Sequence, residues 1–431
     1  MFWFPAFAGM TAVYCLCSPV WSAEPRVAIS TSGITLQECY QRARQISEAV
    51  GISAENTRFV QEQYRAQIGS VLPHIDWIKS QFYQQNIGSG GSSGSAANSS
   101  LKATQPLSYF QVQQPIFAGL RDWSAIAITK SQKEQARLNE QETDLQLLAD
   151  VAAAFYSAYT LQDQLSVLME TRKLNQDQAD QLDRWVNIGR SRPSDLLSAQ
   201  TQLASIDAQI EDTRRTLAES RHLLLFLTGV PAEVPLADQE PAAAGLTLEE
   251  ALTRAGKRPD VLSLVEALHQ SELSIRYARG AHLPTLAATG RYYTERVGFL
   301  SDVRWDATFL LDVPLYEGGS TQAVVRETRS QEIIAQLTLG RLKRDVDRQV
   351  RTAYEDLLHA VSEVQAYDKA VTLAEKNYGV QQKENRLGVT SNLELLQLLT
   401  NMQNIRGQAL ISRANARLDD VLLRVAMGEG L

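Results

Sequence analysis

A large internal repeat constrains the fold of this chain more than any single motif does. Residues of the first half recur 199 positions later, as Val350 follows Val151 and Gly388 follows Gly189. The same spacing relates Ala154, Ala158, Leu161 and Asp195 to Ala353, Leu357, Ala360 and Glu394. A repeat of this size is a whole structural unit. We therefore expect function to reside in what two such units build together.

The repeat divides the 431 residues into four segments. Residues 1–22 form an apolar stretch that ends in small side chains, which predicts a signal peptide. Residues 23–230 form the first repeat, 231–245 a linker and 246–431 the second repeat. Cys15 and Cys17 would leave with the signal peptide. Cys39 would then remain as a small apolar helix residue without a disulfide partner.

Each repeat opens with a predicted helix. Thr35 with Glu38, and Thr247 with Glu250, have the spacing of a capping box, so a helix should begin at each pair. Each helix should run on to a Leu-Pro pair, because proline forces the residue before it out of helical geometry. The two pairs are Leu72-Pro73 and Leu283-Pro284.

A β-hairpin is expected after each Leu-Pro pair, over 74–117 and 285–316. The second hairpin carries the clearer pattern, since apolar residues alternate with mostly polar ones from Val303 to Leu315. This period of two predicts a strand with one apolar face. The lipid-facing candidates on that face are Val303, Trp305, Phe309, Leu311 and Val313. The first hairpin has a Gly- and Ser-rich tip at 88–100, which predicts a flexible loop.

A long segment without proline follows each hairpin and runs to Gly189 or Gly388. About 70 helical residues make a rod of about 100 Å. Both segments space their apolar residues by alternating threes and fours, and the first carries a second such seam beside the main one. A helix with two seams packs on a neighbour at each side, which favours a ring of helices. A coiled-coil scaffold protein is the alternative.

A short turn should return each long helix on itself. Gly189 and Gly388 permit the left-handed conformation that ends a helix, and Ser194 or Asn392 offers a cap to the returning helix. An acidic residue then falls in the first helical turn, at Asp195 and at Glu394, where its charge suits the helix dipole. Local helix chemistry alone therefore accounts for both carboxylates.

The duplicated plan, the Leu-Pro switches and the turns in which an acidic residue and Leu follow Gly at the sixth and seventh positions together resemble the TolC-type outer membrane efflux protein family. The resemblance covers nearly all of the mature sequence. It implies a mainly α fold with β structure, in which long coiled-coil α-hairpins and two β-hairpins per chain form a homotrimer. The trimer would build a 12-stranded transmembrane β-barrel in outer membrane lipid, continued by an α-helical barrel across the periplasm. The implied partners are a periplasmic adaptor protein and an inner-membrane pump.

The resemblance also implies roles for the two helical turns. Asp195 and Glu394 match acidic residues that line the periplasmic entrance. The candidate contacts to the adaptor are Gly189, Ser191, Gly388, Val389 and Thr390. This chain departs from some members at Asn385 and Thr390, where a tyrosine and an arginine can link the closed entrance.

Other classes of function fit the sequence poorly. The formal net charge of −7 and the absence of Lys and Arg clusters argue against nucleic acid as a partner. The five histidines are scattered without metal or triad spacing, and no Gly-rich phosphate loop is present, so we expect neither an enzyme nor a cofactor. A periplasmic coiled-coil adaptor remains the main alternative, although it would not repeat the whole plan. The sequence does not identify the cargo.

Overall fold

The computed structural model describes residues 33–83, 104–238, 245–297, 300–387 and 389–431. The expected signal peptide, the tip of the first hairpin, part of the linker and Gly388 lie outside these ranges.

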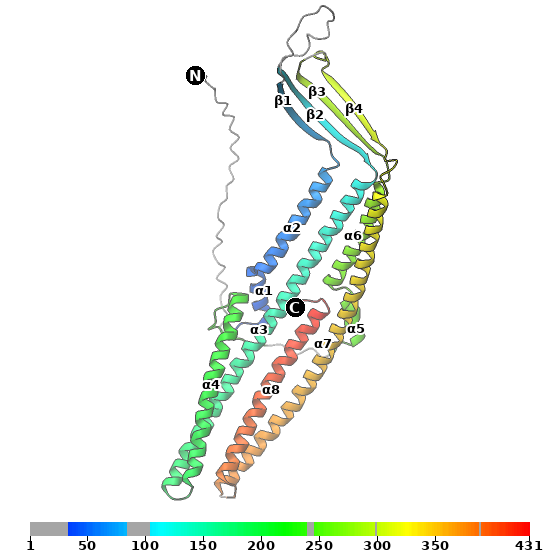
Figure 1. Ribbon diagram of the computed structural model, residues 1–431. Coiled ribbons are helices and arrows are strands. Elements are labelled where there is room, and N and C mark those ends of the chain that lie inside the picture. Colours follow the sequence, from blue (N-terminus) through cyan, green and yellow to red (C-terminus); the bar gives the residue numbers. More distant parts are fainter. Residues whose placement is uncertain (1–32, 84–103, 239–244, 298–299, 388) are drawn as a thin grey trace, which may run out of the picture.

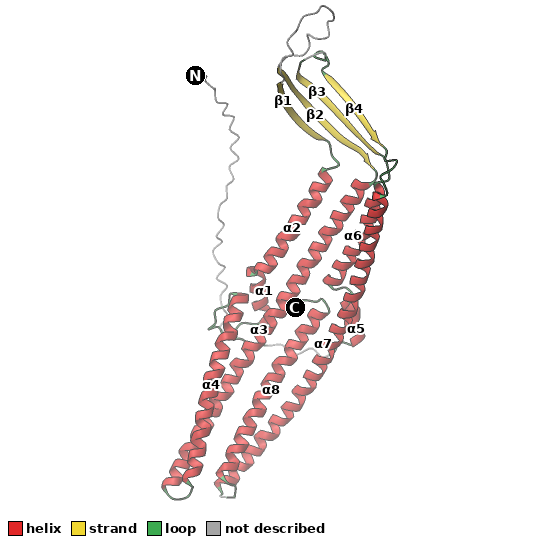
Figure 2. Cartoon of the chain, viewed as in Figure 1, coloured by secondary structure: helices red, strands yellow, loops and turns green. Residues whose placement is uncertain are grey.

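The molecule is elongated, with a sheet at one end and two helical turns at the other (Figures 1 and 2). Its elements follow the chain in this order: α1 (Leu36–Ile46), α2 (Glu48–Gly69), β1 (His74–Tyr83), β2 (Thr104–Ala118), α3 (Arg121–Asn187), α4 (Pro193–Thr228), α5 (Leu248–Ala255), α6 (Pro259–Gly280), β3 (Thr285–Arg296), β4 (Trp305–Asp312), α7 (Ser320–Arg386) and α8 (Asn392–Ala426). The four strands form one antiparallel sheet in the order β1-β2-β3-β4. Strands β1 and β4 are therefore its edges.

The repeat is visible in the bounds of the elements. Helices α3 and α7 both have 67 residues, and α7 begins and ends 199 positions after α3. Helices α2 and α6 both have 22 residues, and α6 lies 211 positions after α2. The larger second spacing is explained by the longer tip of the first hairpin, which separates α2 from α3. These two offsets give an equivalent residue in the other repeat for most helical positions.

The capping boxes at Thr35 and Thr247 are confirmed, since each hydroxyl accepts the amide three residues on and each glutamate bonds back. The prediction of one continuous opening helix in each repeat is wrong. Ser47 takes an extended conformation and caps α2, so α1 and α2 are separate helices. In the second repeat the chain breaks after α5 and restarts with Pro259, whose fixed φ suits the first position of a helix.

Two apolar clusters hold the helices together at mid-height. The first joins α1, α3 and α4 around Val151, Phe155 and Leu224, and the second joins α5, α6, α7 and α8 around Val261, Val350 and Leu423. The heptad positions Val151, Ala158, Val350 and Leu357 are all buried, as their spacing predicts. The start of the linker belongs to the first cluster, because Ile34 pairs with Leu236 in a short parallel bridge.

Strand-to-helix switches place the sheet on top of the helices. Gly119 and Leu120 adopt left-handed φ angles of 64° and 62° directly before α3. A Cβ atom built on Gly280, at the end of α6, would lie 2.3 Å from the carbonyl oxygen of Gly119. Any side chain at either glycine would thus force apart the two repeats at the base of the sheet.

Candidate functional site

The sheet has one aromatic and apolar face. Register places Trp77, Phe110, Tyr292 and Trp305 side by side, one from each strand, so these four rings form a row across the whole sheet. Their exposed fractions are 58%, 46%, 52% and 69%. Large aromatic side chains are rarely left in water in such a row, whereas aromatic bands are typical of membrane interfaces.

Three of the five lipid-facing candidates continue this face along β4. Trp305, Phe309 and Leu311 alternate within the strand, and all are exposed. Val303 and Val313 are also exposed but lie outside β4, which is shorter than the alternating pattern predicted. The apolar face is therefore present, but Val303 and Val313 at its two ends lie in irregular segments that flank β4.

The opposite face carries mostly polar side chains, although Leu310 of β4 is 63% exposed on it. Asp76, Gln111, Arg291 and Asp306 form the corresponding row across the strands. The Arg291 guanidinium donates to Gln111 at 3.1 Å, and the Tyr293 hydroxyl donates to Asp306 at 2.6 Å. A sheet with one apolar and one hydrogen-bonded polar face suits a wall between lipid and water.

The first helical turn lies at the far end of the molecule, between α3 and α4. Gly189 has φ 74°, and the amide of Arg190 donates to the carbonyl oxygen of Trp185 at 2.8 Å. Asp195 falls in the first turn of α4, as predicted, and accepts a hydrogen bond from the Ser191 hydroxyl at 3.2 Å. Ser194 is not the cap, because α4 begins at Pro193 with Arg192 before it.

The second turn joins α7 to α8. Ser391, not Asn392, caps the returning helix, since its hydroxyl accepts the amide of Glu394 at 3.3 Å. Glu394 lies exposed in the first turn of α8. Asn385 is buried and donates to the carbonyl oxygen of Thr390 at 3.0 Å. Val389 is exposed, and its amide donates to the carbonyl oxygen of Glu384 at 3.0 Å.

A polar bridge connects the two turns. The Asn392 amide donates to the Ser191 hydroxyl at 3.2 Å, and the Asn385 amide donates to the side-chain oxygen of Asn392 at 3.1 Å. Asp195, Ser191, Asn392 and Asn385 thus form one hydrogen-bonded chain across both hairpins. Glu394 has no place in this chain. The structure therefore brings one of the two predicted carboxylates into the bridge and leaves the other facing solvent.

Comparison with known proteins fits this geometry. A family model described as outer membrane efflux protein matches residues 40–230 and 249–429. The chain belongs to this family. Outer membrane protein TolC of Escherichia coli is 22% identical over 441 residues, which cover 93% of this chain and 85% of TolC. Alkaline protease secretion protein AprF of Pseudomonas aeruginosa is 26% identical over 318 residues, which cover 67% of this chain and 63% of AprF.

A solved structure supports the same fold. The open-state MtrE outer membrane channel of Neisseria gonorrhoeae superposes with a TM-score of 0.76 at 19% identity, covering 92% of this chain and 89% of MtrE. As a member of the outer membrane efflux protein family, the protein resides in the outer membrane of a Gram-negative bacterium, with a periplasmic extension. The family match favours a channel over the adaptor and scaffold alternatives.

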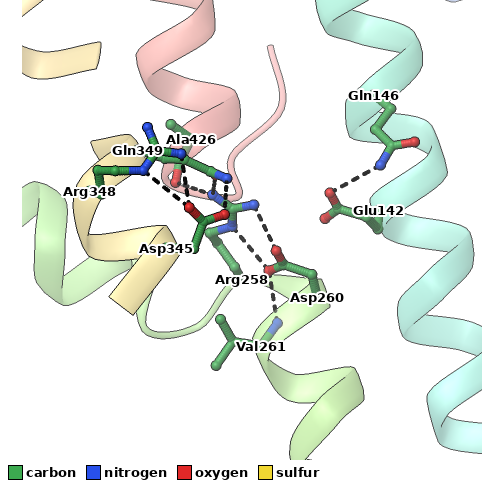
Figure 3. A network of polar contacts seen from close by, with 9 residues as sticks. All are labelled: Glu142, Gln146, Arg258, Asp260, Val261, Asp345, Arg348, Gln349 and Ala426. Atoms are coloured by element: carbon green, nitrogen blue, oxygen red, sulfur yellow. Dashed lines mark hydrogen bonds and ion pairs between the residues drawn. The ribbon is translucent and has the colours of Figure 1, made fainter. Parts of the chain in front are cut away.

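Sequence reasoning missed a buried polar node at mid-height in this efflux family member (Figure 3). Arg258 is only 7% exposed and makes a bidentate ion pair with Asp260, at 2.7 and 3.0 Å. It also donates to the Gln349 side chain at 3.0 Å and to the carbonyl oxygen of Ala426 at 3.1 Å. Since these partners belong to α6, α7 and α8, the node fixes three helices to one another. In the sequence, the local signal for this node is an Arg directly before the proline that starts α6.

Figure 3 also shows Glu142 of helix α3, which lies apart from this node and accepts a hydrogen bond from Gln146. Burial raises the pKa of Glu142 above its ordinary value, and the negative charge of Asp260 raises it further.

Burial also raises the pKa of the Cys39 thiol to about 12, which leaves that thiol protonated and unreactive at neutral pH.

None of the helices in the described ranges is both long and apolar enough to cross a membrane. Across the same part of the chain, no three His, Cys, Asp or Glu side chains are grouped so as to hold a metal ion.

Proposed function

We propose that three copies of this chain form a passive exit duct of a tripartite efflux or type I secretion system. The single observation that carries the proposal is the two-faced sheet, whose aromatic row crosses all four strands while the opposite face is mostly polar. Four strands are too few to enclose an open lumen, and the edges β1 and β4 would remain unpaired in lipid. Three chains together supply a closed 12-stranded barrel.

The long helices would continue this barrel as a tunnel. Helices α3 and α7, at about 1.5 Å per residue, each extend about 100 Å away from the sheet. A length of that order suits a periplasmic passage that opens at the two helical turns. An inner-membrane pump would supply the energy, and a periplasmic adaptor would dock on the turns. AprF is named for the secretion of a protease. The proposed cargo therefore includes proteins as well as small molecules.

At the entrance, Asp195 and Glu394 from three chains would form rings of carboxylates. The carboxylates in such a ring attract cations and repel each other, so other contacts must hold the entrance closed. The bridge from Asn385 through Asn392 to Ser191 offers such a contact within each chain. Gly189, Ser191, Gly388, Val389 and Thr390 remain our candidates for the adaptor-binding surface, with Gly388 outside the described residues.

Conductance tests the duct directly. The protein is extracted from the outer membrane fraction and inserted into planar lipid bilayers without pump or adaptor. We expect discrete conductance steps that need no energy source. A protein that stays in the soluble fraction, or that never conducts even after the bridge residues are replaced, would refute the proposal.

A further inference from the structure

The second repeat contains an open apolar groove at mid-height, between α5, α7 and α8. The groove is a cavity of about 430 Å³, a size typical of ligand-binding pockets. Its apolar wall includes Leu358, which is 51% exposed, and the half-buried Tyr354 and Val361. Leu246, just before α5, and Leu423 of α8 complete that wall.

The first repeat contains the same groove, but there the segment 230–238 that follows α4 fills it. The helices of the two repeats are related by the offset of 199, and the capping boxes by an offset of 212. The counterparts of the wall residues are therefore Ile34 for Leu246, Phe155 for Tyr354, Tyr159 for Leu358, Gln162 for Val361 and Leu224 for Leu423. Val234 and Leu236 of the segment are buried in the same cluster as Ile34 and Phe155.

The segment lies in the first groove as an extended strand. The Ile34 amide donates to the carbonyl oxygen of Pro235 at 2.9 Å, and the Ala237 amide donates to the carbonyl oxygen of Ile34 at 3.0 Å. The Leu236 amide donates to the side-chain oxygen of Gln162 at 3.3 Å. An extended backbone with apolar side chains at alternate positions thus closes the groove of the first repeat.

No described residue takes these places in the second repeat. Leu431 corresponds to Ala232 by the offset of 199, so Val234 and Leu236 have no counterpart in the described part of the chain. Over the same ranges, no hydrogen bond to the backbone of Leu246 is found. Its amide and carbonyl groups therefore form an open edge, to which an extended peptide adds as a strand.

The charges around the second groove favour an apolar occupant. Arg254 pairs with Glu429 at 3.1 Å, and Arg424 pairs with Asp420 at 3.0 Å. These four residues are all the charged residues of the lining, so its charges balance and leave no excess to attract an ionic ligand. Burial of apolar side chains and pairing of the backbone are what this groove offers.

We propose that the second groove binds an extended peptide segment of a partner protein, with apolar side chains at two alternate positions. The segment pairs with Leu246 as Leu236 pairs with Ile34, and its apolar side chains pack on Tyr354 and Leu423. The groove is built from one chain alone, so this site does not depend on the proposed duct.

The two grooves differ at the position of Gln162. Val361 stands there in the second groove and offers no acceptor to the strand, so the bond made by the Leu236 amide is lost. The bond made by the Ala237 amide keeps its acceptor, which is the carbonyl oxygen of Leu246. A peptide in the proposed register therefore needs one of these two amides and not the other.

A fluorescein-labelled peptide with the sequence of residues 232–237, amidated at its end, tests the site on the full chain in detergent. Fluorescence anisotropy should show saturable binding of one peptide per chain. Leu358→Glu should weaken binding at least about tenfold, because it places a charge in the apolar wall. Leu373→Glu is the matched control, since Leu373 is 57% exposed on the same helix and lies outside the lining. It should change the affinity less than about twofold.

Two methylated peptides test the register of the strand. Methylation of the amide nitrogen at Ala237 removes the donor to Leu246 and should weaken binding at least about tenfold. Methylation at Leu236 removes no bond and should change the affinity less than about twofold. Equal effects of the two methylations would overturn the proposed strand addition.

The absence of saturable binding up to about 1 mM peptide, or binding that Leu358→Glu leaves unchanged, would overturn the site. Binding that appears only after residues 24–32 are deleted would assign the groove to this chain's own N-terminal segment, which lies outside the described residues. That result would overturn the partner. Each of these results leaves the proposed duct standing.

Discussion

Breaking the polar bridge between the two helical turns should make the duct open more readily. The change is Asn392→Ala, which removes the bond to Ser191 at 3.2 Å and the bond from Asn385 at 3.1 Å. Ser191→Ala removes the same inter-turn bond from the other side. Both variants remove the polar link between the two turns and leave in place the apolar contact of Leu396 with Leu182 and Ala199.

The magnitude follows from the bonds that are lost. A partly exposed hydrogen bond contributes about 0.5–1.5 kcal/mol net. The inter-turn bond alone should therefore favour the joined turns about twofold to tenfold in each chain, since 1.4 kcal/mol is a factor of ten. Because both single variants remove this one bond, their effects should not add. The double variant should fall short of the sum by about 0.5–1.5 kcal/mol.

Single-channel recording in planar bilayers measures the ratio of open to closed time for the four proteins of this cycle. Asn187→Ala is the matched control, because its amide bonds to Asp183 of the same helix at 3.3 Å and crosses to no other turn. Strict additivity of the two single variants would refute this coupling between the turns. Equal opening by Asn187→Ala and Asn392→Ala would refute it too.

Three other predictions follow from the described contacts. Arg258→Ala should lower the free energy of unfolding by about 3–5 kcal/mol, because it leaves buried partners without their cation. Arg254→Ala, at an exposed ion pair, should lower it by less than about 1 kcal/mol. Thermal unfolding in detergent compares the two variants. Glu142→Gln should raise the melting temperature at neutral pH but not at about pH 4. A carboxyl whose pKa is raised on folding lowers the free energy of unfolding at any pH above that pKa. This loss disappears once the carboxyl is protonated. Asp195→Ala combined with Glu394→Ala should reduce cation preference and blockade by multivalent cations in bilayers, and unchanged selectivity would remove the carboxylate rings.

Local chemistry made much of the fold predictable. The capping boxes lie where they were expected, and strands β1 and β3 begin directly after the two Leu-Pro pairs. The alternation around Trp305 is also present, although β4 is shorter than it predicts. The two expected turn caps, Ser194 and Asn392, are wrong because each lies inside its helix rather than before it. Pro193 takes the first helical position and thereby makes Arg192 the cap, and Ser391 precedes Asn392 with a hydroxyl of suitable length.

Features made by distant segments could not be predicted in this way. The aromatic row depends on the register between Trp77, Phe110, Tyr292 and Trp305, which alternation alone does not fix. The node around Arg258 recruits its partners from two other helices, and the bridge from Ser191 to Asn392 joins residues 201 positions apart. Such contacts follow from how the two repeats pack, which no local pattern specifies.

The detergent-corrected molar mass of the protein extracted from the outer membrane fraction tests the shared barrel most directly. One chain is 47.8 kDa with its predicted signal peptide. A mass of three mature chains is the result we predict, since only then do the four strands of each chain form a closed wall. A soluble protein with the mass of one or two chains would contradict it.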